Sequence, residues 1–234
     1  MMNWRVAIAA GLWIGLIEAN SPAAPAEGRP VVVELFTSQG CSSCPPADQL
    51  LAELAQRSDL IALGFHIDYW DSLGWKDPLS TSQGTARQRS YARLLGNGQV
   101  YTPQMIVEGT REMVGSRREE VLAALHEARP QAIAPVAFAA DRRSVTIGAT
   151  VTPGATGTIL LVRLVKERKT QIGAGENANR TARDVNGVEA LQTLGAWQGG
   201  EVRFSIAPPS ADHSIAVLVQ ATDGRMLGAA LLGS

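Results

Sequence analysis

The sequence predicts an α/β protein whose C-terminal part is built from antiparallel β-strands. Three observations lead to this prediction. Apolar runs alternate with helical patterns in the first half of the chain, and a lone cysteine pair stands between a strand and a helix. β-Branched runs separated by turn residues then follow residue 133. The 234 residues are enough for one large domain or two small ones.

The first 26 residues are expected to be a secretory signal. Arg5 precedes an almost wholly apolar run, Val6 to Ile17, and small residues including Ala24 and Ala26 follow. This order is typical of a signal peptide, and the run is too short to span a bilayer comfortably. We therefore expect cleavage after Ala26 and a periplasmic or secreted protein without a membrane span, with an uncleaved anchor as the alternative.

The charge balance gives no support to one class of partner, the nucleic acids. The formal net charge is -1, and 18% of the residues are charged. Nucleic-acid binding relies on basic surface, so this composition gives no reason to expect a nucleic acid as a partner.

Residues 27–132 have the pattern of an α/β domain. Val31 to Phe36 and Leu60 to Ile67 are predicted strands, and Pro46 to Arg57 is a predicted helix between them. Such a unit implies parallel strands joined by a right-handed crossover. An aromatic and helical insertion follows at 68–100, and then a hairpin and a helix that ends near Pro130.

Residues 133–234 are predicted to form a β-rich, sandwich-like module. Pairs of turn residues such as Pro153-Gly154 and Asp223-Gly224 separate short β-branched runs. The predicted strands are 136–138, 144–151, 158–166, 200–206 and 214–221.

The chain contains two cysteines, Cys41 and Cys44, three positions apart. A disulfide across so short a loop removes little entropy from the unfolded chain, so structural stapling explains it poorly. A zinc site usually needs four ligands, and no second cysteine pair exists. In an oxidising compartment, the pair therefore indicates thiol–disulfide chemistry.

Several motifs together resemble a bacterial family of secreted, thioredoxin-like proteins of unknown function. They are the run ELFTSQGCSSCPPAD at 34–48, the aromatic run at 69–75, and Gly175-Glu176-Asn177. Over roughly residues 30 to 130, the order of elements resembles the thioredoxin fold. The resemblance implies that Pro103 is cis and packs beside the cysteine pair, where the Thr102 backbone would position a substrate segment as an added strand.

The expected chemistry assigns a role to each cysteine. A thiol at a helix N-terminus has a lowered pKa, so Cys41 is the predicted nucleophile and Cys44 the resolving thiol. No cofactor is expected beyond the redox-active disulfide. The expected partners are protein thiols or disulfides and a redox partner protein. Trp70 and Trp75 are candidates for the floor of a substrate groove, or else form the core of the insertion.

Glu34 is a charged residue within an otherwise apolar predicted strand. Thioredoxins keep a buried acid at a similar place, so the resemblance implies that Glu34 exchanges a proton with Cys44. Burial would raise the pKa of such an acid. The alternative is a carboxylate that reaches solvent or forms a salt bridge.

Two further functions compete with the oxidoreductase. Cys41, Cys44 and His66 are soft ligands that suit Cu(I), as in copper chaperones with a thioredoxin fold, although those use a longer cysteine spacing. The other is a non-catalytic binding module whose β-rich half recognises a partner. His66 itself is more typical of a satisfied core histidine.

Overall fold

The computed structural model describes Met1 and residues 28–96 and 98–233. Apart from Met1, the predicted signal and its cleavage site lie outside these residues. Within the described part of the chain, no helix has the length and apolar character needed to cross a membrane.

The structure contains the strands predicted from apolar runs and two further strands in the second half of the chain, at Thr181–Trp197 and Met226–Leu232. In the first half they are β1 (Val31–Thr37), β2 (Leu60–His66), β3 (Gln104–Val107) and β4 (Arg111–Val114). In the second half they are β5 (Val136–Phe138), β6 (Ser144–Ile147), β7 (Gly157–Gln171), β8 (Thr181–Trp197), β9 (Val202–Ser205), β10 (His213–Gln220) and β11 (Met226–Leu232).

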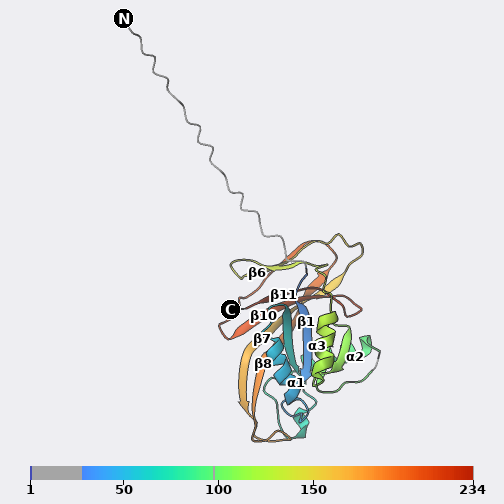
Figure 1. Ribbon diagram of the computed structural model, residues 1–234, viewed down its shortest axis with the longest axis vertical. Helices are drawn as coiled ribbons and strands as arrows, with labels where there is room; N and C mark the ends of the chain where they lie inside the picture. The colour runs from blue at the N-terminus through green and yellow to red at the C-terminus, as the bar shows by residue number, and fades with distance from the viewer. Residues whose placement is uncertain (2–27, 97, 234) are drawn as a thin grey trace.

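Eight of these strands form one mixed sheet in the order β11-β10-β7-β8-β2-β1-β3-β4 (Figure 1). β1 and β2 are parallel, as the crossover predicts, and β3 and β4 form the expected hairpin. The strands of the C-terminal part pair antiparallel with one another, which confirms the predicted antiparallel character.

Helices cover the two faces of the first half of the sheet. The alternation along β1 sends Val33 and Leu35 into a cluster with α1 (Pro45–Leu54) and α3 (Arg118–Glu127). Val32 and Phe36 enter a second cluster, which contains Tyr91 of α2 (Ser82–Leu94). A short 3-10 helix, η1, spans Asp71–Leu73 in the aromatic insertion.

The predicted boundary at residue 132 does not separate two sheets, because β8 pairs directly with β2. The two strands meet at Gly64 and Gly187, whose backbones are close. A Cβ on Gly187 would lie 2.9 Å from a methyl of Leu79, and one on Gly64 would lie 3.2 Å from a methyl of Leu51. Glycine at both positions therefore leaves room for Leu79 and Leu51 to pack where the two strands pair.

A second layer gives the C-terminal part its sandwich-like character. β5, β6 and β9 form a three-stranded antiparallel sheet, and β6 lies apart from the helices in Figure 1. Val145 and Ile147 of this sheet share an apolar cluster with Ile159, Leu161 and residues of β10. One layer of the predicted sandwich is thus a part of the main sheet.

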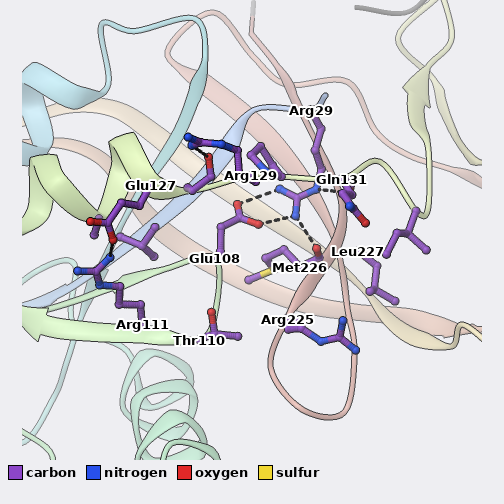
Figure 2. Close-up of a pocket in the computed structure, with 15 residues that line it drawn as sticks. Arg29, Glu108, Thr110, Arg111, Glu127, Arg129, Gln131, Arg225, Met226 and Leu227 are labelled. Atoms are coloured by element: carbon purple, nitrogen blue, oxygen red, sulfur yellow. Dashed lines mark hydrogen bonds and ion pairs between the residues drawn. The ribbon is translucent and has the colours of Figure 1, made fainter. Parts of the chain in front are cut away.

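Arg29 joins three segments of the chain beside a surface hollow (Figure 2). Its guanidinium binds both carboxylate oxygens of Glu108 and donates to the carbonyl oxygens of Gln131 and Met226. These contacts link the chain before β1 to the β3–β4 turn and to β11. Neither cysteine lines this hollow. Arg111, which does line it, forms an ion pair with Glu127.

Glu34 of β1 is fully buried and forms an ion pair with Arg87 of α2. The Tyr91 hydroxyl also donates to Glu34, and Arg87 donates in addition to the side chain of Gln220. Every charged atom of the pair is thereby satisfied within an apolar cluster.

Replacing Glu34 by Gln leaves the Arg87 guanidinium buried without its counter-charge. We expect the free energy of unfolding to fall by about 3–5 kcal/mol, measured by chemical denaturation with the disulfide intact. The control is Asp59→Asn, which breaks an exposed pair with Arg57 and is expected to cost less than about 1 kcal/mol. Equal losses in both variants would contradict the structural role of the buried pair.

Candidate functional site

The cysteine pair stands between the end of β1 and the start of α1, as the sequence predicts. Cys41 and Cys44 form a disulfide, and Cys44 occupies the N-cap position of α1. The Cys44 N–H donates to the Cys41 carbonyl oxygen at 3.2 Å, which closes a turn ahead of the helix. Both cysteines are 0% exposed, so a reacting group reaches the sulfur atoms only after a covering element moves.

The start of α1 offers few N–H donors to a thiolate on Cys41. Pro45 and Pro46 occupy the first helical positions and carry no N–H, and the next two N–H groups donate to the Cys44 carbonyl. The Ser42 N–H is taken by the carboxylate of Glu176. The Ser43 hydroxyl lies 3.3 Å from the Cys41 sulfur.

Thr102 and Trp70 lie beside the cysteine loop. The Thr102–Pro103 peptide bond is cis, as predicted. The Trp70 indole N–H donates to the Thr102 hydroxyl at 2.9 Å, and the Ser43 hydroxyl donates to the Thr102 carbonyl at 3.5 Å. The aromatic insertion therefore braces the segment that was predicted to bind substrate.

Trp75 contacts the site through Gln39 of the same loop. Its indole N–H donates to the side-chain oxygen of Gln39 at 3.0 Å. Gln39 in turn donates from its side-chain amide to Asp184 and from its backbone to Asp77. Trp75 is thus a support for the cysteine loop.

Glu34 is not brought to the cysteines. The alternation of β1 directs it to the face opposite α1, where Arg87 and Tyr91 hold its carboxylate. The alternative of a salt-bridged carboxylate is confirmed, and the position of Glu34 does not support proton exchange with Cys44.

His66 is a buried histidine surrounded by carboxylates. Its Nδ1 is 2.7 Å from Asp77, and its Nε2 is 3.7 Å from Asp184. Asp48, one turn after Cys44 in α1, accepts a hydrogen bond from Thr37 at 2.6 Å, and Thr37 lies opposite His66 in the β1–β2 register. We call His66, Asp48, Asp77 and Asp184 the acid–histidine cluster. Of these four residues, His66 is a candidate from sequence, whereas the three acids are not.

The groups of the acid–histidine cluster shift one another's pKa. Burial works to lower the pKa of His66, but the charges of Asp77, Asp184 and Asp48 outweigh it and raise the pKa to about 9. Burial raises the pKa of Asp48 to about 7 and also raises that of Asp184. Burial opposes ionisation of Asp77, yet the charge and hydrogen bond of His66 lower its pKa. Asp48 therefore exchanges a proton near neutral pH.

A cavity of about 260 Å³ connects this cluster with the surface. Asp48 and Asp184 line it together with Gln39, Pro45 and residues of β8. Protons and water can reach the acids by this opening without passing the disulfide.

The connection between β7 and β8 covers the cysteine loop, and we call residues 172–180 the strap. The Asn177 amide donates to the carbonyl oxygens of Gln39 and Cys41, both at 2.9 Å. The Glu176 carboxylate accepts the Ser42 N–H at 3.1 Å. Both residues belong to the family motif Gly175-Glu176-Asn177, from which no role in the site is predicted.

The copper alternative with Cys41, Cys44 and His66 is not supported by these contacts. Both ring nitrogens of His66 face carboxylates, and the two sulfur atoms are joined to each other. Over residues 28–96 and 98–233, no group of three His, Cys, Asp or Glu side chains is placed to hold a metal ion.

The stability of the protein is expected to depend on the charge of His66. Its pKa in the folded protein is above the usual value of 6.5, so folding takes up a proton and the free energy of unfolding falls as the pH rises from 6.5 to about 9. Denaturation of the oxidised protein over this range tests the slope. His66→Gln is expected to flatten it, and a level profile in the unsubstituted protein would contradict the assignment.

Comparisons with known proteins identify the family. The structure resembles Protein AGR_C_4864 from Agrobacterium tumefaciens, with a TM-score of 0.75 and 32% identity over 89% of this chain and 96% of that chain. It also resembles HBP35 of Porphyromonas gingivalis in fold, with a TM-score of 0.53 and 14% identity over 88% of this chain and 75% of that one. Among curated proteins, none matches. A family model described as "Protein of unknown function (DUF1223)" matches residues 32–220, and the chain therefore belongs to this family.

Proposed function

We propose that this protein is an extracytoplasmic thiol–disulfide oxidoreductase that uses Cys41 and Cys44 on protein substrates. The observation that carries the proposal is the position of the disulfide, at a strand-to-helix junction beside a buried cluster of protonatable groups. A bond across so short a loop contributes little to stability, whereas exchange chemistry needs both sulfur atoms and a proton acceptor.

The order of elements supports a thioredoxin-type fold for residues 27–132. β1, the cysteine loop, α1 and β2 come first, and β3, β4 and α3 follow the Thr102–Pro103 bond. A disulfide in the described structure also fits the oxidising compartment that the signal sequence predicts.

The proposed reaction transfers two electrons from a substrate dithiol. A substrate thiolate attacks the Cys41 sulfur, a mixed disulfide forms, and the Cys41–Cys44 bond breaks to release the Cys44 thiolate, which takes up a proton. The second substrate thiol loses its proton and attacks the mixed disulfide. The substrate leaves as a disulfide, and the protein keeps two thiols. The same steps run backwards when a reduced protein meets a substrate disulfide.

Asp48 is the group we assign to proton exchange with Cys44. It stands one turn further along α1, and its backbone N–H donates to the Cys44 carbonyl. Its pKa of about 7 suits both delivery and removal of a proton at neutral pH. The cavity beside Asp48 and Asp184 then connects it to solvent.

The substrate is expected to lie along the Thr102 backbone, next to Trp70. Main-chain groups beside the disulfide can pair with an extended segment while the sulfur atoms react. Trp70 holds the Thr102 hydroxyl, so it positions this segment from the side.

Removal of Cys44 tests the proposal directly. In Cys44→Ala, the Cys41 thiolate attacks a substrate disulfide, one substrate sulfur leaves as a thiolate, and the mixed disulfide that forms has no resolving thiol. It is expected to accumulate with disulfide-bonded proteins of an extracytoplasmic extract, detected on non-reducing gels and by mass spectrometry. Cys41→Ala is the matched control and is expected to trap far less. If neither variant traps a protein, or both trap equally, the proposed division of roles is wrong.

Asp48→Asn is expected to slow exchange with a model dithiol by about a hundredfold near neutral pH, because a positioned acid or base typically contributes that much. The rate profile should also lose its inflection near pH 7. Glu53→Gln is the control, since Glu53 is an exposed acid on the same helix. A rate and profile like those of the control would remove Asp48 from the mechanism.

A further inference from the structure

The strap is held firmly on both sides of Glu176. Gly175 has a φ of +75°, and a Cβ there would lie 3.2 Å from the Cβ of Trp75, so a glycine suits this approach. Asn177 is 2% exposed and bridges two carbonyl oxygens of the cysteine loop. Each residue of the motif Gly175-Glu176-Asn177 therefore has a separate contact with the site or its support.

The side chain of Glu176 is exposed, but its carboxylate contacts the backbone N–H of the residue after Cys41. It accepts this Ser42 N–H at 3.1 Å. Hydrogen bonds from Ser42 lower the pKa of Glu176, so the carboxylate is charged at neutral pH. A negative charge is thus bound to the residue that directly follows Cys41, whose sulfur becomes a thiolate on reduction.

The helix start offers few other N–H donors that could stabilise a thiolate on Cys41. Pro45 and Pro46 carry no N–H, and the N–H groups of Ala47 and Asp48 bond within the helix. A thiolate on Cys41 has the Ser43 hydroxyl near it, whereas Glu176 holds the Ser42 N–H. A carboxylate held on Ser42 and a thiolate on the adjacent Cys41 are like charges close together and repel each other.

We propose that Glu176 is a positioning residue that sets the redox equilibrium of the Cys41–Cys44 pair: bound to Ser42, it stabilises the closed disulfide relative to the dithiol with an ionised Cys41. This inference rests on the proposed oxidoreductase function. Coupling is reciprocal, so a thiolate on Cys41 weakens the hold of Glu176 as much as Glu176 disfavours the thiolate. Reduction then loosens the strap over the site.

Equilibration with glutathione measures this effect. Two glutathione thiols supply two electrons, the Cys41–Cys44 bond breaks, and one glutathione disulfide forms. Both protons pass to the cysteines, or one is released to solvent when Cys41 stays ionised. The ratio of dithiol to disulfide is read by thiol trapping and mass spectrometry at about pH 8–9, where thiols begin to ionise.

Glu176→Gln keeps a side-chain oxygen for the Ser42 N–H and removes the charge. We expect the equilibrium to shift about threefold toward the dithiol, the size of effect typical of one charge at a helix start. The shift should shrink in about 1 M salt, where the Debye length is about 3 Å. A change caused by altered packing alone would not depend on salt in this way.

Glu167→Gln is the matched control, because Glu167 is an exposed carboxylate on the same hairpin that pairs with Arg183. It is expected to leave the equilibrium unchanged. If the disulfide exchanges with glutathione but Glu176→Gln behaves like this control, Glu176 does not set the equilibrium. If the disulfide of the unsubstituted protein does not exchange with glutathione at all, the proposed function fails instead.

Discussion

The close approach of β2 and β8 at Gly64 and Gly187 decides how the rest of the molecule is arranged. His66 of β2 and Asp184 of β8 come from the two strands that meet there, and the His66 Nε2 lies 3.7 Å from the Asp184 carboxylate. It also directs the β7–β8 connection over the cysteine loop. A sheet of eight strands and a site assembled from both halves of the chain thus depend on the pairing of β2 with β8.

Buried charge is handled differently on the two faces of this sheet. Glu34 and Arg87 lie in an apolar cluster and satisfy each other as an ion pair. At the cysteine end, His66 faces more carboxylates than it can neutralise, and a cavity reaches two of them. The first arrangement supports the fold, whereas the second keeps a proton available near neutral pH.

Local patterns predicted the first half of the fold well. The cysteine junction and the parallel strands follow from short apolar runs and motif spacing, and the cis bond at Pro103 follows from the resemblance to the thioredoxin fold. The sequence does not predict β8, because charged and small residues break its apolar pattern. It does not predict β11 either, because this strand directly follows a turn and has glycine and alanine in its own middle. Long-range pairing, which no local pattern records, decides both strands.

The site was predictable where it is local in sequence. Strand alternation alone places Glu34 opposite Leu35, which faces α1, so its distance from the cysteines could have been anticipated. Asp48 is four residues after Cys44 and therefore lies on the same side of the helix. Asp184, Glu176 and Asn177 reach the site through tertiary structure. Glu176 and Asn177 belong to a family motif, but the motif does not say what they contact, and no pattern marks Asp184.

The bridge from Asn177 to the cysteine loop has a consequence for how the protein matures. The two partners are 136 residues apart, and the chain is synthesised from its N-terminus. The cysteines are therefore complete, and open to any oxidant they meet, long before the segment that buries them exists. The order of synthesis thus gives an external oxidant its freest access to the pair before folding ends, and docking of the hairpin encloses whichever redox state has been reached by then.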